Sequence, residues 1–495
     1  MRFTIVLQLV LFSLVAAVRA QSTEPQPGPR TEPATPGAQS DPRVERLEAE
    51  ARERGQRLEA ALARIEALEQ SAEEQRLAEE ARLAEEARRA DEAEAAQNEE
   101  SPWTIRPLVS SFVRLEVREG YDALSVTPPS CNGADGDCFR WRARLGLDVG
   151  LDLSERVNVR ARFLPEVAGF WASSPGFSGG VTDPAVGLHE GSLLLSVGET
   201  FGVELGRFEM IYGEHVVIGN LGWHPSARAF DGARLLLRSG GAQIDAFFTV
   251  LNESGDPEPG RSDSYFYGVY AKLGGLIDEA TALDVYVLGR QTNNSFDPVS
   301  AARRGWSQRT HIGARFKRRF GIVDLRAEGG LQIGRMGMPD PADAELILAG
   351  HALAEVGLNL ANDLVRLSLE GAYASGDDPN TSKVESYDQL FPTAHAFLGL
   401  ADVMGARSNV GTAIVHAQVK PTDTLVLRLD GHVFARPQNA GEAYYGIETD
   451  LHLIWKPFPG FRTRLMAAVF VPNEDAWGDD EVVRYVEVEV GYDFR

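Results

Sequence analysis

A histidine and an aspartate lie in the longest irregular stretch of the chain. The segment SYDQLFPTAHAFLGLADVMGARSNV, residues 386–410, carries His395 and Asp402 seven positions apart. A histidine beside a carboxylate is a pair that catalytic sites use for general acid–base chemistry. However, no second histidine stands at metal-ligand spacing, and the motif H-E-x-x-H does not occur. We therefore expect His395 and Asp402 to have a structural, hydrogen-bonding role.

No other pattern in the sequence supplies a catalytic set. The sequence shows no Ser-His-Asp arrangement, no cluster of metal-ligand residues and no close pair of carboxylates. We therefore expect no enzyme activity, no cofactor and no metal site.

The two cysteines of the chain, Cys131 and Cys138, lie close together in CNGADGDC. In an exported chain such a pair readily forms a disulfide. The acidic residues between them could bind Ca²⁺, but the segment lacks the ligand spacing and the terminal glutamate of an EF-hand loop. We therefore expect a disulfide in an external loop, and we favour a solvated loop over a calcium site.

Arginines gather on one face of segments in which apolar and polar residues alternate. In FRWRARLGLDVGLDL, residues 139–153, Arg142 and Arg144 share one face and the apolar residues share the other. In RVNVRARF, Arg160 and Arg162 alternate with Ala161 and Phe163 in the same way. If the apolar face meets lipid, these arginines face the inside of a barrel, because arginine on the lipid side costs about 2–4 kcal/mol near the bilayer midplane. The same rule points four more arginines inward: Arg366, Arg428, Arg462 and Arg464. Such a band of planar, permanently charged donors suits the passage of anions.

The same arginines have a second interpretation. Acidic residues such as Asp148, Glu370 and Asp430 fall on the same faces, so the arginines can pair with them and support the shape of the barrel. Both interpretations can hold, because pore selectivity comes from the unpaired members of a partly paired ladder. The net charge of −23 argues against a nucleic-acid partner and mildly against strong anion selectivity.

The elements that must position these residues are strands. Between residues 103 and 494 the two-residue alternation recurs in about eighteen segments, separated alternately by short connections such as LAND and by longer ones. Short turns at one end and long loops at the other are typical of an outer-membrane barrel, and an even strand count returns the chain to its starting side. The mature chain has no apolar run long enough for a membrane-spanning helix. The expected fold is therefore all-β: a closed, antiparallel transmembrane β-barrel of about 18 strands over residues 101–495.

The N-terminal part of the chain has a different composition. Residues 1–20 have the early arginine, the apolar core and the small-residue cleavage site of a secretory signal peptide. Residues 21–42 are rich in proline and polar residues, which predicts a disordered tether. The composition of residues 43–100 predicts a charged helix, and apolar a and d positions over residues 44–72 predict a periplasmic coiled coil. A solvated single helix that serves as a spacer and needs only Glu–Arg pairs is the alternative.

Two blocks of the sequence resemble a known family. The first is GRFEMIYGEHVVIGNLGWHPSARAFDGARL, residues 206–235, and the second is ASGDDPN, residues 374–380, followed by FPTAHAFLGLADVMG. Together they resemble the alginate export family of outer-membrane porins, and the similarity extends thinly over residues 101–495. The resemblance is carried by Gly206, Arg207, Tyr212, Gly213, Ile218, Gly219, Trp223, Arg228, Phe230, Asp231, Gly232, Arg234, Pro392, Thr393, His395, Gly399, Asp402 and Gly405.

The resemblance implies an eighteen-stranded barrel with an arginine-lined pore that passes an anionic polysaccharide. Within such a barrel, the apolar residues of 386–410 predict a loop that folds into or over the lumen, and the irregular insert GEHVVIGNLGWHPSARAF predicts a second constriction loop. The residues expected at the constriction are Tyr212, Trp223, Arg228, His395 and Asp402. Asp231 and Arg234, beside the irregular insert, are expected to line the channel and to orient part of the arginine band by pairing.

The sequence therefore predicts a porin in the cell outer membrane, in contact with its lipid, with the N-terminal segment in the periplasm. Its arginine-lined channel would export or pass anionic saccharides, such as an alginate-like polysaccharide, or other small anions. A trimeric phosphate-type or general diffusion porin is the alternative. Residues 44–72 would supply a homo-oligomer contact.

Overall fold

The computed structural model describes most of the chain from residue 101 onward. The described residues are 82, 85, 88, 101–126, 135–173, 185–252, 263–293, 306–337, 344–393, 395, 397–438 and 441–494. The chain divides into two units, Met1–Ala93 and Glu94–Arg495. None of the described helices is long and apolar enough to span a membrane.

In the first unit, Arg82, Glu85 and Arg88 are helical. Arg88 Nη2 lies 2.9 Å from Glu85 Oε1, one turn away on the same exposed helix face. The predicted signal peptide, the tether and the coiled-coil seam of residues 44–72 lie outside the described residues.

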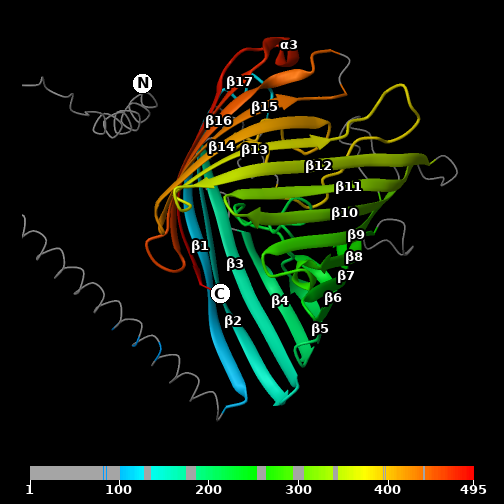
Figure 1. The fold of residues 1–495 in the computed structure, drawn as a ribbon, viewed down its shortest axis with the longest axis vertical. Coiled ribbons are helices and arrows are strands. Elements are labelled where there is room, and N and C mark those ends of the chain that lie inside the picture. The colour runs from blue at the N-terminus through cyan, green and yellow to red at the C-terminus, as the bar shows by residue number, and fades with distance from the viewer. Residues whose placement is uncertain are drawn as a thin grey trace, which may run out of the picture. The chain divides into compact units, whose positions relative to one another are not determined.

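The second unit is a single sheet that closes on itself (Figure 1). Each strand pairs antiparallel with the next along the chain, and β1 pairs with β18 to complete the ring. The prediction of a closed antiparallel barrel is confirmed, with 18 strands. The strands are β1 (Trp103–Glu119), β2 (Gly136–Ser154), β3 (Val157–Ser173), β4 (Ala185–Val197), β5 (Phe201–Phe208), β6 (Phe230–Ser239), β7 (Ala242–Asn252), β8 (Ser264–Lys272), β9 (Thr281–Asn293), β10 (Trp306–Phe320), β11 (Val323–Gly337), β12 (Glu345–Leu360), β13 (Val365–Ala374), β14 (Val410–Thr422), β15 (Leu425–Ala435), β16 (Tyr444–Trp455), β17 (Phe461–Pro472) and β18 (Val483–Phe494).

The alternation of side chains decides which face of each strand turns inward. In β1, Val113 and Leu115 are exposed on the outer face, whereas Arg114 and Glu116 are buried inside the ring. Successive residues of a strand point to opposite faces, so this pattern gives an apolar exterior and a charged interior. An apolar outer band around a polar lumen is the arrangement that a membrane-spanning barrel needs.

The two ends of the barrel differ. At one end, here called the turn end, tight connections such as residues 155–156, 240–241 and 321–322 join the strands. Gly240 and Gly241 both have positive φ, at 54° and 89°, as the tightest hairpin turns require. At the other end, the loop end, the connections are longer and include α3 (Glu474–Trp477). The 3-10 helix η2 (Gly274–Leu276) lies in the connection between β8 and β9.

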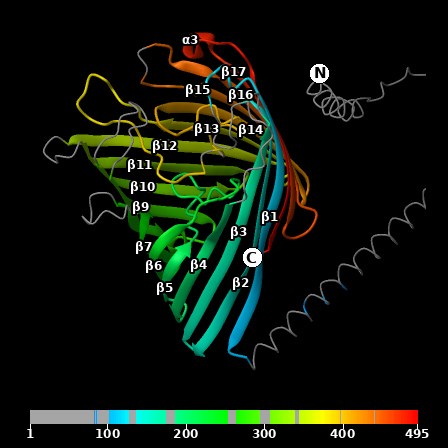
Figure 2. The same ribbon diagram turned by 180° about the vertical axis from the view of Figure 1, so that it is seen from behind.

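Two long connections from the loop end place buried apolar residues inside the ring, and Figure 2 shows the green one inside the wall. We call residues 209–229 the first inward loop and residues 375–409 the second inward loop. Apolar residues of both loops are buried against inward-facing aromatic side chains of the wall, in two clusters. The core of the second unit therefore lies within the barrel, as the apolar composition of residues 386–410 predicted.

Candidate functional site

The two inward loops are hydrogen-bonded to each other around one isolated parallel bridge, between Ile218 and Phe391. The Phe391 amide donates to the carbonyl of Val217 at 3.0 Å, and the Gly219 amide donates to the carbonyl of Phe391 at 2.8 Å. The Thr393 amide donates to the carbonyl of His215 at 2.9 Å. Segments that are far apart in the sequence therefore form one unit inside the lumen.

Arg228 strengthens this junction. Its Nη1 donates to the carbonyl of Gly219 at 2.9 Å and to that of Pro392 at 3.1 Å, and it also contacts the carbonyl of Phe391. Burial, together with the nearby charge of Arg290, lowers the pKa of Arg228 to about 10. A guanidinium can serve several carbonyls at once because its donors are fixed in a planar fork.

An aromatic contact forms a second link between the loops. The rings of Trp223 and His395 are stacked, with centroids 4.7 Å apart. His395 Nδ1 lies 2.7 Å from Asp402 Oδ2, within the second inward loop. Burial alone would lower the pKa of His395, but the Asp402 carboxylate outweighs it, so the pKa of His395 is raised. The structure thus gives His395 and Asp402 the kind of structural contact that the sequence predicted.

Tyr212 attaches the first inward loop to the barrel wall. Its ring stacks on Tyr270 with centroids 4.4 Å apart, and its hydroxyl donates to Asp245 Oδ2 at 3.0 Å. All five residues predicted for the constriction therefore lie in the two inward loops and contact the wall or the other loop: Tyr212, Trp223, Arg228, His395 and Asp402.

Buried arginines of β1 and β2 donate hydrogen bonds to backbone carbonyls of the first inward loop. Arg142 Nη1 donates to the carbonyls of Gly222 and His224 at 3.2 and 3.3 Å. Arg114 Nη2 donates to the carbonyl of Trp223 at 2.7 Å. Burial and the nearby arginines lower the pKa of His224 to about 4, so its ring is neutral at pH 7. Arg144 donates to Glu166 Oε2 at 2.6 Å and more weakly to the carbonyl of Ser226 at 3.4 Å. In this arrangement these arginines are covered by the loop.

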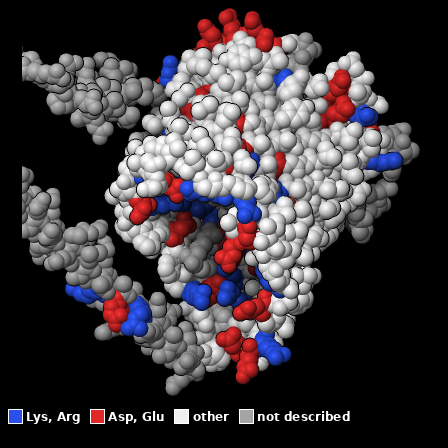
Figure 3. All heavy atoms as spheres, viewed as in Figure 1, with Lys and Arg blue, Asp and Glu red and all other residues white. Residues whose placement is uncertain are grey.

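A charged cavity of about 640 Å³ opens inside the lumen toward the turn end. Figure 3 shows a hollow in the molecule where acidic and basic side chains mix. The cavity is lined by six basic residues, Lys317, Arg318, Arg319, Arg326, Arg366 and Arg428, and by five acidic residues, Glu214, Glu279, Asp324, Glu355 and Glu370. Phe397 of the second inward loop and His416 also line it.

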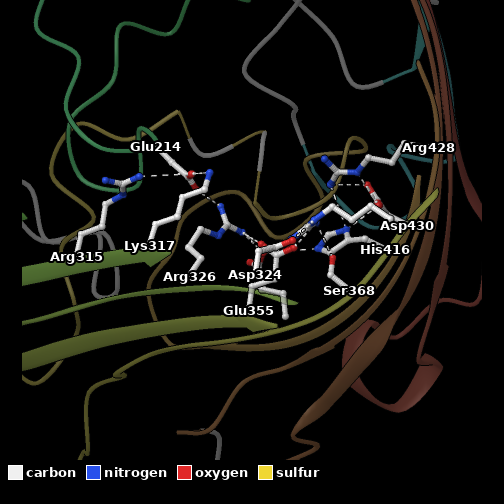
Figure 4. A network of polar contacts seen from close by, with 12 residues as sticks. Glu214, Arg315, Lys317, Asp324, Arg326, Glu355, Ser368, His416, Arg428 and Asp430 are labelled. Carbon is white, nitrogen blue, oxygen red and sulfur yellow. Dashed lines mark hydrogen bonds and ion pairs between the residues drawn. The ribbon is translucent and has the colours of Figure 1, made fainter. Parts of the chain in front are cut away.

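The first inward loop reaches this cavity through Glu214 (Figure 4). The Glu214 carboxylate accepts hydrogen bonds from Lys317 and Arg326, and Arg315 Nη2 lies 3.5 Å away. Burial alone would raise the pKa of Glu214, but Arg326 and Lys317 outweigh it and lower the pKa to about 2. Glu214 therefore holds the loop to β10 and β11 by charge.

Comparison with known proteins assigns the family. The profile described as alginate export matches residues 194–472, more than half of the 495-residue chain. The chain belongs to the alginate export family. No curated protein sequence matches it.

Solved porin structures share the fold of this alginate export family member. OpdK of Pseudomonas aeruginosa, solved with vanillate, has a TM-score of 0.54 at 14% identity, covering 79% of this chain and 98% of that chain. OccK5 (OpdH) of the same organism has a TM-score of 0.52 at 12% identity, with the same coverage of 79% and 98%. The outer membrane protein OprD of Pseudomonas aeruginosa has a TM-score of 0.50 at 11% identity, covering 80% and 94%. The chain is thus a porin-like barrel.

The remaining arginines predicted for the channel of this alginate export family barrel lie on the inner face, and each faces a carboxylate. Arg162 lies 3.0 Å from Asp148 and 2.9 Å from Glu190, and Arg160 lies 3.3 Å from Asp148. The other ion pairs are Arg366 with Asp324 and Glu355, Arg428 with Asp430, Arg462 with Glu489 and Asp493, and Arg464 with Glu487 and Glu489. This is the arrangement of the second sequence interpretation, in which arginines and lumenal acids pair.

Asp231 does not lie where the sequence interpretation put it. The two residues Asp231 and Arg234 are three positions apart in β6, so their side chains point to opposite faces. Arg234 faces the lumen and its Nε donates to Glu204 Oε2 at 3.2 Å, whereas Asp231 is exposed and pairs with Arg207 at 2.8 Å. The expectation that Asp231 lines the channel with Arg234 is therefore wrong.

The cysteine expectation needs one correction. Cys138 is disulfide-bonded and lies within β2, buried, instead of in a loop. Cys131 lies outside the described residues.

Several charged residues of the site were missed by the sequence interpretation. They are Arg114 under the first inward loop, and Glu214, Lys317, Arg319 and Arg326 around the cavity. The alternation in SFVRLEVR and ARFKRR would have placed Arg114, Lys317 and Arg319 on the inner face.

Proposed function

We propose that this protein is an outer-membrane porin whose lumen passes anionic saccharides or other small anions. The observation that carries the proposal is the cavity inside the barrel, on whose inner wall the exposed basic side chains of Lys317 and Arg319 lie. A narrow, low-dielectric passage amplifies the effect of such charges, because field lines are focused through it. Membership in the alginate export family supports an anionic saccharide as the solute.

The side chains proposed to set selectivity are the basic ones that remain in contact with water. Lys317 and Arg319 are two positions apart on β10, face the same side, and keep exposed side-chain fractions of 51% and 46%. Arg428 keeps 36%. A carboxylate on a passing solute can compete for such exposed pairs, since an exposed ion pair is worth only about 0–1 kcal/mol. Weak, spaced sites let a solute bind and leave again.

The inward loops are proposed to act as the constriction of this channel. The buried arginines Arg142 and Arg144, predicted from the sequence to line the pore, serve here to hold the first inward loop in place. In this proposal Arg160, Arg162, Arg462 and Arg464 support the charge balance of the wall through their ion pairs.

The proposal includes a location and a domain organisation. The apolar exterior would lie in the outer membrane, and residues 21–100 would extend into the periplasm as tether and helix. Residues 44–72 would join chains into a homo-oligomer. We propose transport, without enzyme activity, as the role of the barrel.

A general diffusion or trimeric phosphate-type porin is the second candidate. The near balance of basic and acidic side chains around the cavity favours a general diffusion pore. A general diffusion pore would separate solutes mainly by size, with little dependence on the sign of their charge.

Liposome swelling distinguishes the two candidates. Proteoliposomes containing the full chain are placed in isotonic solutions of glucose or of sodium glucuronate, two sugars of similar size. The proposal predicts that glucuronate enters faster than glucose, and that added salt reduces this difference in rate. Equal rates for the two sugars would favour the general porin. If the positively charged sugar glucosamine entered faster than glucuronate, the anion proposal would be contradicted.

A further inference from the structure

Histidines and carboxylates gather on the inner faces of three neighbouring strands, β14, β15 and β16. Across the sheet, His416 lies opposite Asp430, Asp430 lies opposite Asp450, and Arg428 lies opposite His452. In the next row toward the loop end, His432 lies opposite Glu448. None of these histidines belongs to the constriction or to the ion pairs discussed above.

The charges in this group are poorly balanced. Asp430 and Asp450 are 1% and 2% exposed and stand directly opposite each other, a placement that is destabilising for like charges. Glu448, also buried, lies two positions from Asp450 on the same face. Among the described residues, Arg428 is the only arginine or lysine in an ion pair with any of these three carboxylates. The group therefore has room for additional positive charge.

Buried polar atoms in this group lack hydrogen-bond partners. Asp450 Oδ1 and Glu448 Oε2 have no hydrogen bond in the structure, although both side chains are at least nine-tenths buried. Native proteins rarely leave such atoms unsatisfied, and a bound ion is one way in which they are satisfied.

The donor atoms are close enough to share one ion. Asp430, Asp450 and His452 each offer an atom, and these three atoms lie within 4.8 Å of one another. His452 Nε2 is 3.0 Å from Asp430 Oδ2. Two ligands that bind one ion at about 2.0–2.2 Å stand at most about 4.4 Å apart, and the pair of His452 and Asp430 lies within that limit.

A second layer of contacts orients the donors. His416 Nδ1 lies 2.6 Å from Asp430 Oδ1, and His432 Nε2 lies 3.1 Å from Asp450 Oδ2. Polar contacts of this kind behind the ligating atoms orient carboxylates and imidazoles in metal sites. His416 and Arg428 also line the lumenal cavity, which supplies an entry path for a hydrated ion.

We propose that Asp430, Asp450 and His452 bind a divalent transition-metal ion of the Zn²⁺ class. Imidazole and carboxylate donors together suit Zn²⁺ and its neighbours better than Mg²⁺ or Ca²⁺, which prefer oxygen ligands alone. The ion offsets the repulsion between the two opposed aspartates. Arg428, which now contacts Asp430 at 2.7 Å, moves toward the cavity when the ion binds, and its exposed side chain has space to do so.

The site has a direct connection to the second inward loop. The Leu400 amide donates to Asp450 Oδ2 at 3.2 Å, and the Ala401 amide donates to Glu448 Oε1 at 2.8 Å. An ion that fixes Asp450 therefore also fixes the wall to which this loop is attached.

Isothermal titration of the untagged, full-length protein in detergent, freed of metal with a chelator, tests the site with ZnCl₂ as the probe. We expect about one tightly bound Zn²⁺ per chain, and a loss of affinity of at least roughly tenfold in Asp450→Asn and in His452→Gln. Arg428→Gln should bind Zn²⁺ more tightly than wild type, because it removes a competing positive charge. Heat-modifiable migration in gel electrophoresis checks that each variant is folded.

His351→Gln is the matched control. His351 is a buried lumenal histidine on β12 whose ring nitrogens also lack hydrogen bonds, but it belongs to no group of metal-ligand residues among the described ones. The proposal predicts unchanged Zn²⁺ affinity in this variant. Absence of binding to the wild type overturns the proposal. So does binding that Asp450→Asn, His452→Gln and Arg428→Gln leave unchanged.

Discussion

The indole of Trp223 is stacked on the imidazole of His395, with ring centroids 4.7 Å apart, and each ring comes from a different inward loop. The same loops share backbone hydrogen bonds and the Arg228 contacts. Because they are joined at several points, one loop cannot leave the lumen without disturbing the other. The constriction should therefore open and close as one unit.

Removing the stacked ring should loosen this unit. An aromatic pair contributes about 0.5–1.5 kcal/mol beyond its buried area, so Trp223→Ala should raise the population of open states by about 2- to 13-fold. Single-channel recording in a planar bilayer measures this population. Trp103→Ala, on the outer face of β1, is the control and should leave it unchanged. Equal open populations in wild type and Trp223→Ala would contradict the joint constriction.

The contact between His395 and Asp402 should make the second inward loop sensitive to alkaline pH. The pKa of His395 is raised in the folded protein, so its stabilising contribution is complete below its ordinary pKa of 6.5. The contribution is lost as the pH rises through the raised value. We expect more frequent opening as the pH increases above about 6.5, and no such dependence in Asp402→Asn. Channel recordings over this range that show the opposite trend would contradict the assignment.

Glu214 should make the first inward loop sensitive to acid. Its pKa is lowered to about 2 from 4.5, so its contribution is present above 4.5 and is lost as the pH falls toward 2. Conductance should therefore rise over this range as the loop leaves Lys317 and Arg326. Glu214→Gln should show the raised conductance already at neutral pH. Glu279→Gln, in the same cavity, serves as the control for a simple change of charge.

Arg228→Lys should weaken the junction even though the charge is kept. An ammonium group lacks the planar fork with which Arg228 contacts three carbonyls. Amide hydrogen exchange at Gly219 and Phe391 should become faster, whereas exchange in the barrel strands should not change. The control is Arg207→Lys, since Arg207 pairs with the exposed Asp231. Unchanged protection of both amides would show that Arg228 does not hold the junction.

The fold could be predicted from the sequence because one physical rule governs each strand. Alternation of apolar and polar residues, as in β1 and β2, follows directly from one face meeting lipid and the other the lumen. The alternation of short turns and longer loops then predicted that each strand pairs with the next one along the chain. The inward position of the second inward loop followed from its apolar residues, which could not remain in water.

The partners of the charged residues could not be predicted in the same way. Whether Arg462 meets Glu489 depends on the register between β17 and β18, which periodicity alone does not give. The prediction for Asp231 was wrong because residues three positions apart in a strand point to opposite faces, although they are close in the sequence. The group of Asp430, Asp450 and His452 could not be predicted, because Asp430 on β15 meets the two residues of β16 only through the register between these strands.

The reversal potential across a planar bilayer under a KCl gradient tests the central claim most directly. Wild type should show anion preference, and Lys317→Gln combined with Arg319→Gln should shift the reversal potential toward cations, because the two exposed basic side chains of the cavity wall are then neutral. Arg484→Gln, which lies outside this cavity, should leave it unchanged. A wild-type pore that prefers cations, or a double variant with the wild-type reversal potential, would contradict anion selection by the lumenal bases.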